Sequence, residues 1–179
     1  MQKPVITETK TVAKSHLFRV EEVHLTFSNG EKRIYERLCP ARYRAVMIVP
    51  LINEDTILLV REYSVGVEGY TLGFPKGLVE PGENLLDGAN RELMEEVGMG
   101  AHKFTYMREL MLSPNYMQHK IDLVLAEDLY EKRLEGDEPE LLEVVRWKLS
   151  DIDDLLAQPD FIESRSLTAL LLLWKSKQS

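Results

Sequence analysis

The chain has 179 residues, of which 44% are apolar and 29% are charged. This is the composition of one globular domain, with or without a small extension, and it excludes a disordered chain. The formal net charge of −8 argues against a general nucleic-acid binder, because such proteins need a basic surface to displace counterions from phosphates.

Residues 1–40 predict an antiparallel β extension that precedes a main domain at 41–179. Val23, Leu25 and Phe27 alternate with polar residues, and Asn29-Gly30 is typical of a type I′ hairpin turn. Ile34 and Tyr35 then lie on the returning strand. Three such strands bury little by themselves, so we expect them to pack on the main domain or on a partner subunit.

The location is expected to be cytoplasmic. The first 14 residues contain no apolar run of the kind that signal peptides carry. The single cysteine, Cys39, cannot form a disulfide within the chain, which suits a reducing compartment. The longest apolar stretch, Ala169 to Trp174, is far shorter than the roughly 20 residues of a membrane span, so no membrane partner is expected.

The main domain is predicted to be an α/β sandwich with a mixed sheet, because apolar strand-like runs alternate with two or three helical segments. A loop rich in glycine and proline is expected at Pro75–Gly82. The expected strands are Ala45–Leu51, Thr56–Val60, Tyr70–Phe74, Phe104–Leu112, Ile121–Ala126 and Val144–Leu149.

Three helices are expected. Asn84–Val97 carries an apolar stripe at helical spacing, formed by Leu86, Ala89, Leu93 and Val97, and Gly98 is a natural C-terminal stop. A second, short helix should begin at a capping pair formed by Ser150 and Asp153. The third should run from Ser164 to Lys175, and the two tryptophans, Trp147 and Trp174, are expected in the core.

Three glutamates on the first helix indicate a metal site. At about 100° per residue, Glu92, Glu95 and Glu96 fall within one arc beside the apolar stripe. Each pair of carboxylates at about 6 Å repels by about 3 kcal/mol at an effective dielectric constant near 20. A divalent cation such as Mg²⁺ relieves this repulsion and keeps coordination sites for water and a phosphate. Arg91 is expected to pair with Glu83 and hold the preceding loop against the helix.

The segment Gly77–Met99 matches every position of the Nudix box, G-x5-E-x7-R-E-U-x-E-E-x-G-U, with Leu93 and Met99 at the apolar positions. The chain therefore resembles the Nudix hydrolases. Its layout is similar to that of the ADP-ribose pyrophosphatase group, and in particular to the bacterial ADP-compounds hydrolases. That closer similarity lies in Tyr35–Arg37, Ala45–Pro50, Arg61–Tyr63, Gly77–Leu78, Ala89–Leu93 and Leu134–Glu140.

The resemblance implies a Nudix α/β/α sandwich, a homodimer formed through residues 1–40, and a metal-activated water that attacks phosphorus. The implied ligands of Mg²⁺, of Mn²⁺ or of another divalent cation are Glu92 and Glu96, with Glu95 assisting and the backbone carbonyl of Lys76 as a further ligand. The general base in this group often lies on a late acidic loop. We therefore assign it to Glu138, with Glu135, Asp137 and Glu140 as rivals and Glu95 as a second catalytic carboxylate.

Substrate contacts follow less directly. Pro114 lies 16 residues beyond Gly98, where ADP-ribose enzymes carry a proline, and Tyr116 lies where dinucleoside polyphosphate hydrolases carry a tyrosine. The expected contacts are Tyr116 with a base and Arg44, Arg61 and Lys76 with phosphates; ordinary packing and ion pairs are the alternatives.

Two departures from the ADP-ribose pattern, Gly73 and His119 at positions where that group has glutamates, favour broad specificity. We therefore expect a pyrophosphohydrolase of ADP-linked small molecules, such as ADP-ribose, diadenosine triphosphate or NADH, that releases AMP. A GDP-sugar hydrolase and a non-catalytic nucleotide sensor are the alternatives. The intact glutamates of the box argue against the sensor.

Overall fold

The computed structural model describes residues 1–39 and 44–178. It divides into two compact units, Met1–Arg42 with Met111–Lys120, and Tyr43–Leu110 with Ile121–Ser179. The predicted boundary between residues 40 and 41 lies outside the described residues. The first unit contains the segment Met111–Lys120, which the sequence placed in the main domain.

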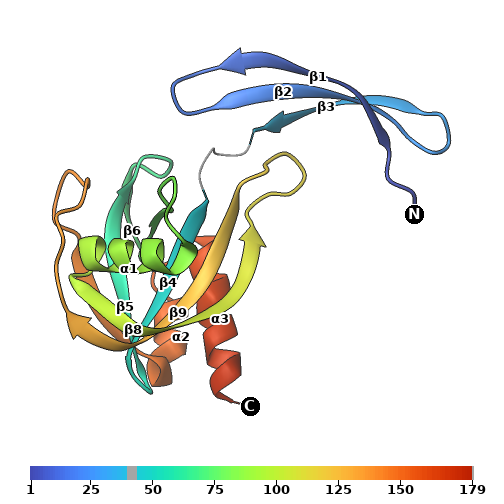
Figure 1. Ribbon diagram of the computed structural model, residues 1–179. Coiled ribbons are helices and arrows are strands. Elements are labelled where there is room, and N and C mark those ends of the chain that lie inside the picture. Colours follow the sequence, from blue (N-terminus) through green and yellow to red (C-terminus); the bar gives the residue numbers. More distant parts are fainter. Residues whose placement is uncertain (40–43, 179) are drawn as a thin grey trace. The chain divides into compact units, whose positions relative to one another are not determined.

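The first unit contains an antiparallel sheet of β1 (Val5–Lys14), β2 (Arg19–Thr26) and β3 (Lys32–Leu38), in that order (Figure 1). The Leu38 N–H donates to the carbonyl of Tyr116 at 2.8 Å, and this bond ties the segment Met111–Lys120 to the end of β3. The three-stranded extension is therefore as expected, but a second part of the chain completes it.

The turn between β2 and β3 is not type I′. That type needs a positive φ at both central residues, whereas the non-glycine residues with positive φ in the described ranges are Glu68 and Asp128. Gly30 has a φ of +85°, and the Phe27 N–H donates to the Glu31 carbonyl at 2.8 Å. This is a three-residue loop in which glycine takes the left-handed position, as in a type I turn followed by a bulge.

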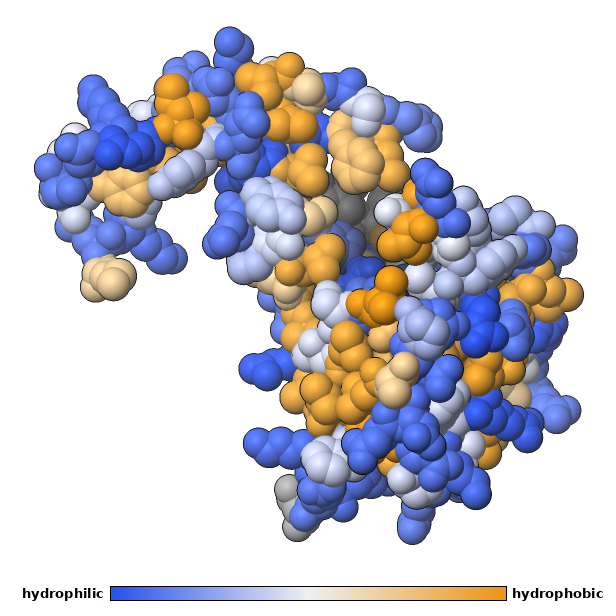
Figure 2. Space-filling view, turned by 180° about the vertical axis from the view of Figure 1, so that it is seen from behind, coloured by the Kyte–Doolittle hydropathy of each residue, from blue (hydrophilic) through white to orange (hydrophobic). Residues whose placement is uncertain are grey.

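Much of the apolar surface of this unit is exposed (Figure 2). Every residue of β1 is exposed, whereas Val23 on β2 is buried. Within residues 5–35 of this unit, the exposed large apolar side chains are those of Val5, Ile6, Val12, Leu17, Phe18, Ile34 and Tyr35.

The second unit is built on a mixed sheet of seven strands in the order β10-β5-β4-β9-β8, with β6 paired to β5 and β7 to β4. β4 and β9 run parallel, and β4 is antiparallel to β5 and β7. The short strand β7 lies within the segment predicted to be only a loop. The bounds are β4 (Ala45–Asn53), β5 (Thr56–Ser64), β6 (Gly69–Gly73), β7 (Lys76–Leu78), β8 (Met99–Met111), β9 (Lys120–Glu131) and β10 (Glu143–Lys148).

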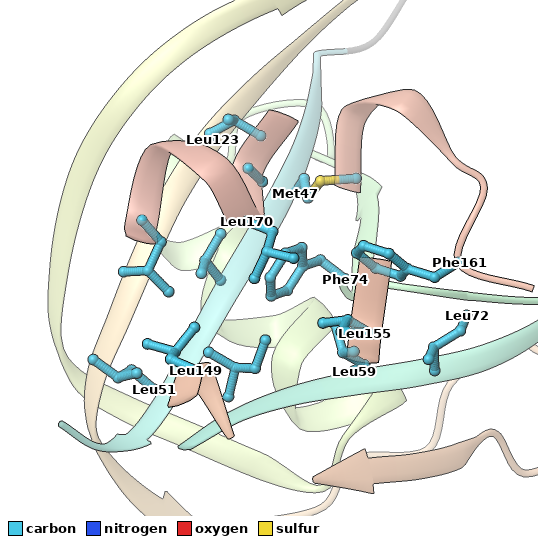
Figure 3. Close-up of a cluster of buried hydrophobic side chains, with 14 of the residues drawn as sticks. Met47, Leu51, Leu59, Leu72, Phe74, Leu123, Leu149, Leu155, Phe161 and Leu170 are labelled. Atoms are coloured by element: carbon cyan, nitrogen blue, oxygen red, sulfur yellow. The ribbon is translucent and has the colours of Figure 1, made fainter. Parts of the chain in front are cut away.

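Helices cover both faces of this sheet, which confirms the α/β/α sandwich (Figure 1). α1 (Leu85–Glu96) packs on one face, and α2 (Ile152–Leu156) with α3 (Ser164–Lys177) packs on the other. Side chains alternate along β4, so that Val46 faces α1 and Met47 faces α3. Burial of each large apolar side chain contributes about 1.5–3 kcal/mol. Figure 3 shows the core between the sheet and the α2 and α3 helices, with Met47, Leu59, Phe74, Leu123 and Leu170.

Three further local predictions were wrong. Leu86 is 40% exposed, because Leu85 packs against the core and the stripe runs through Ala89 and Leu93. Trp174 is 37% exposed, since Ala169, Leu170 and Leu173 form the buried face of α3. The predicted pairing of Ser150 and Asp153 as a helix cap is not formed.

Ser150 instead lies inside a 3-10 turn, η1 (Leu149–Asp151), that runs directly into α2. Its N–H donates to Asp55 Oδ1 at 2.9 Å. Trp147 packs against the core, as expected, and its indole N–H donates to the Asp151 carbonyl. Among the helices described, none is long and apolar enough to cross a membrane.

Candidate active site

The position of the three glutamates is set by the ends and the buried stripe of α1. The Asn84 side chain caps the N-terminus by accepting from the N–H groups of Leu86 and Asp87, each at 3.0 Å. Gly98, with a φ of +78°, ends the helix, as predicted. Since Ala89 and Leu93 are fully buried, the neighbouring arc of the helix lies at the edge of the core.

Arg91 joins the loop, the helix and the acidic cluster. Its guanidinium donates to both carboxylate oxygens of Glu83 at 3.2 Å, which confirms the predicted pair, and to the Leu78 carbonyl at 2.7 Å. It also donates to Glu92 and Glu95 at 2.9 Å each. One cation therefore neutralises part of the repulsion within the cluster and fixes the preceding loop to α1.

Gly77 is needed because the Glu92 carboxylate lies against it. A Cβ at this position would lie 2.0 Å from Glu92 Cδ. The Glu92 side chain is 12% exposed, and burial raises its pKa, against the opposing effect of Arg91. The loop glycine and the helix glutamate therefore form one packed unit.

Glu96 is the most deeply buried carboxylate of the cluster, at 6% exposure. It accepts a hydrogen bond from the Lys76 N–H at 3.0 Å. Burial raises the pKa of Glu96 to about 8, and the charges of Glu92 and Glu62 act in the same direction, whereas Lys76 opposes them. In the absence of a bound cation, an ionised Glu96 is therefore costly.

Lys76 brings two groups to the cluster. Its main chain bonds Glu96, and its ammonium pairs with Glu62 on β5 at 2.5 Å. Both side chains are partly exposed, at 27% and 28%. No role for Glu62 was predicted from the sequence. Glu62 lies outside the Nudix box, and only the pairing of strands brings its side chain near Lys76.

The predicted acidic loop after β9 lies beside these glutamates. Glu135, Asp137 and Glu138 line the same two overlapping cavities, of about 360 and 840 Å³, as Glu92, Glu95 and Glu96. Burial, with the charges of Glu62 and Asp137, raises the pKa of Glu138. Of the two cavities, Glu140 lines only the smaller one, and its carboxylate accepts a hydrogen bond from the Tyr70 hydroxyl at 2.6 Å.

Two of the remaining expected contacts, Arg44 and Arg61, do not line these cavities. Arg44 bonds the buried Asp122, and Arg61 pairs with Glu143 at 2.6 Å and with Asp160 at 2.9 Å. Tyr116 belongs to the first unit, where its side chain is 54% exposed. Both arginines therefore form ion pairs within the fold, which was the predicted alternative to phosphate contacts.

The donor set suits a hard divalent cation. The carboxylates of Glu92, Glu95 and Glu96 line one cavity together with Lys76, and carboxylate oxygens are ligands that Mg²⁺ and related ions prefer. Within residues 1–39 and 44–178, no three Asp, Glu, His or Cys side chains stand at metal-binding spacing. Arg91 bonds both Glu92 and Glu95, so a cation that bound these two carboxylates would compete with those bonds.

The chain matches the NUDIX domain over residues 41–171 and the NudE-type Nudix hydrolase N-terminal domain over residues 4–37. It belongs to the Nudix hydrolase family.

Full-length relatives agree. The chain is 53% identical over 173 residues to the ADP compounds hydrolase NudE of Escherichia coli, covering 97% of this chain and 92% of that protein. It is 29% identical over 175 residues to the ADP-ribose pyrophosphatase of Bacillus subtilis, covering 93% and 92%. A crystal structure of an ADP compounds hydrolase superposes with a TM-score of 0.93 at 50% identity, over 99% of this chain and 96% of that one.

The chain is a Nudix pyrophosphohydrolase, and Nudix hydrolases generally need divalent cations. The structure gives physical reasons for three box positions: Gly77 leaves room for Glu92, Arg91 clamps Glu83, and Gly98 ends the helix. Two residues near the cluster, Arg133 and Glu62, were not predicted from the sequence. Arg133 bonds the end of α1 from a distant part of the Nudix domain, and no local pattern marks such a contact.

Proposed function

We propose that this chain uses Mg²⁺ to hydrolyse the pyrophosphate of ADP-linked compounds such as ADP-ribose, diadenosine triphosphate and NADH, releasing AMP. The observation that carries the proposal is one cavity system lined both by the box glutamates and by the acidic loop after β9. The names of two long relatives, an ADP compounds hydrolase and an ADP-ribose pyrophosphatase, support this substrate class.

In this proposal Glu92, Glu96 and the backbone carbonyl of Lys76 hold the cation, with Glu95 assisting. Mn²⁺ or another divalent cation is the alternative to Mg²⁺. A bound divalent ion supplies an activated water and neutralises charge that develops on the phosphate oxygens. A contact between the Lys76 ammonium and a phosphate is part of the proposal, and it is supported by the position of Lys76 in the lining of the larger cavity, where its ammonium pairs with Glu62. Phosphate contacts by Arg44 and Arg61 and base stacking by Tyr116 stay predictions.

The test is product analysis with equal concentrations of ADP-ribose, diadenosine triphosphate, NADH and a GDP-sugar. We expect AMP from at least one ADP-linked compound with Mg²⁺ and none with EDTA. Addition of Mn²⁺ or Ca²⁺ after EDTA treatment then ranks the cations. Turnover of the GDP-sugar alone would replace the proposed substrate class, and no turnover of any compound would favour a nucleotide sensor.

We propose Glu138 as the general base. Its raised pKa suits proton acceptance near neutral pH, and it lines both cavities. Glu138→Gln is expected to lower kcat by about 10²- to 10⁴-fold with little change in KM, because general-base catalysis contributes about that much.

The controls are Glu135→Gln and Asp137→Asn, which remove one charge each from the same loop. Steady-state kinetics at saturating Mg²⁺ measures all three variants. A normal kcat for Glu138→Gln together with a large loss in one control would move the base to that residue.

We further propose that the chain forms a homodimer through the β extension and acts in the cytoplasm. The exposed apolar side chains of β1 and β3 support an interface between two copies (Figure 2). The single free cysteine, Cys39, suits a reducing compartment.

A further inference from the structure

The C-terminal end of α1 is held by the segment that follows β9. The last carbonyls of a helix have no partner within it, so they must be satisfied from outside. Here the Leu134 N–H donates to Met94 O at 3.2 Å, and the Lys132 N–H donates to Gly98 O at 3.2 Å. Two main-chain bonds thus join the distant segment to the end of the helix.

Between these bonds, the guanidinium of Arg133 completes the attachment. Nη1 donates to the carbonyl of Glu95 at 3.3 Å, and Nη2 donates to the carbonyl of Val97 at 3.1 Å. A cation at this end also interacts favourably with the helix dipole. Arg133 bonds main-chain carbonyls and thereby differs from Arg91, which bonds carboxylates of the cluster.

The attachment needs space that only glycine leaves. A Cβ on Gly98 would lie 2.6 Å from Nη2 of Arg133 and 2.9 Å from its Cζ. A Cβ on Gly136 would lie 3.3 Å from Cβ of Glu95. Gly98 therefore ends the helix and also leaves room for the Arg133 guanidinium. The acidic loop stays in close contact with α1 at Gly136.

This attachment determines where the loop carboxylates lie. Glu135 follows Leu134 directly, and Glu138 is four residues from that anchor, within about 14 Å of chain. In Figure 1 the segment after β9, in orange, passes the end of α1. Loss of the anchor would let the loop move relative to Glu92, Glu95 and Glu96, with which it lines the cavities.

We propose that Arg133 is a positioning residue for the hydrolytic reaction. Its two bonds to the end of α1 hold the acidic loop in register with the glutamates of the helix, and Gly98 provides the space for it. The inference rests on the proposed function, because it concerns the same cavities.

Arg133→Ala tests this against Lys132→Ala, a matched control. Both residues are exposed and both substitutions remove one positive charge, but Lys132→Ala keeps the main-chain bond to Gly98 and both side-chain bonds of Arg133. We expect kcat of Arg133→Ala to fall by about 10- to 100-fold at saturating Mg²⁺, since a displacement near 1 Å can cost that much. KM should change by less than kcat, and amide hydrogen exchange at Leu134 should accelerate. Lys132→Ala should match the wild type in all three.

A merely structural role would lower the melting temperature but leave kcat of the folded enzyme unchanged. If Arg133→Ala does not fold, Arg133→Gln replaces it. The proposal requires a kcat at least about fivefold below wild type, since a single amide nitrogen on a shorter side chain replaces the two guanidinium nitrogens that bond the two carbonyls. Equal kcat in the folded Arg133 variant and the Lys132 control overturns the inference. Absence of AMP from the wild-type enzyme would instead overturn the proposed function.

Discussion

Replacing Glu96 by glutamine is expected to lower kcat by about 10³-fold while making the metal-free protein more stable. The loss of turnover follows because a metal site supplies several kcal/mol of transition-state stabilisation, and each 1.36 kcal/mol is about tenfold in rate. The amide oxygen can still accept from the Lys76 N–H, so the fold around β7 should persist. Turnover of AMP-yielding substrates at saturating Mg²⁺ gives the first readout.

The gain in stability has a defined pH range. The pKa of Glu96 is about 8 in the folded, metal-free protein, above its usual value near 4, so the folded state binds this proton more tightly. Its favourable contribution is complete below about pH 4 and is lost as the pH rises through 8, by on the order of 5 kcal/mol. Thermal unfolding in EDTA should therefore show stability that falls between pH 5 and 8, and the fall should be smaller in Glu96→Gln.

Glu95→Gln is the control for this experiment. Glu95 is expected to be a second catalytic carboxylate that assists the cation and not one of its main ligands, so its substitution should reduce kcat less than that of Glu96. Unchanged turnover in Glu96→Gln would show that the assignment of this glutamate as a metal ligand is wrong. An identical pH dependence in the variant and the wild type would show that another group titrates.

Replacing Arg91 by alanine is expected to destabilise the metal-free protein by about 3 kcal/mol, because it leaves three partly buried carboxylates without their cation. The lost contacts are those to Glu83, Glu92, Glu95 and the Leu78 carbonyl. Bound Mg²⁺ can neutralise the helix glutamates but not Glu83, so it should reduce the effect without removing it. Urea unfolding in EDTA and in Mg²⁺ measures both values.

Lys103→Ala is the control for Arg91→Ala. Lys103 pairs with Glu127 at 2.7 Å, but its side chain is 64% exposed, and exposed pairs contribute about 0–1 kcal/mol. Similar losses for the two variants would mean that Arg91 is one more surface ion pair rather than the clamp between loop and helix.

The sequence predicted the parts of the fold that local patterns determine. The helix at 84–97 was found because its cap, Asn84, its buried residues and its stop, Gly98, all lie within one short segment. The same holds for the clamp between Arg91 and Glu83, since the box spacing places them near each other. Leu86 was wrongly predicted to lie on the buried side of the helix. Leu85, its neighbour, packs against the core instead.

The rest depends on contacts between distant segments. Glu62 reaches Lys76 because β5 and β7 are both paired within one sheet around β4, and Arg133 reaches α1 because β9 ends beside it. Ser150 forms its hydrogen bonds with Asp55, nearly a hundred residues earlier, instead of capping its own helix. None of these partners leaves a periodicity or a motif in the chain.

The bond between Leu38 and Tyr116 has a consequence for the order in which the chain is made. β1, β2 and β3 leave the ribosome long before residues 111–120 exist. During that interval the N–H and carbonyl of Leu38 lack the partners that Tyr116 and Gln118 later provide. An unpaired strand end of this kind, beside exposed valine and isoleucine side chains, is open to pairing with another nascent chain. In the homodimer proposed above, the pairing of two copies could therefore begin before either is complete.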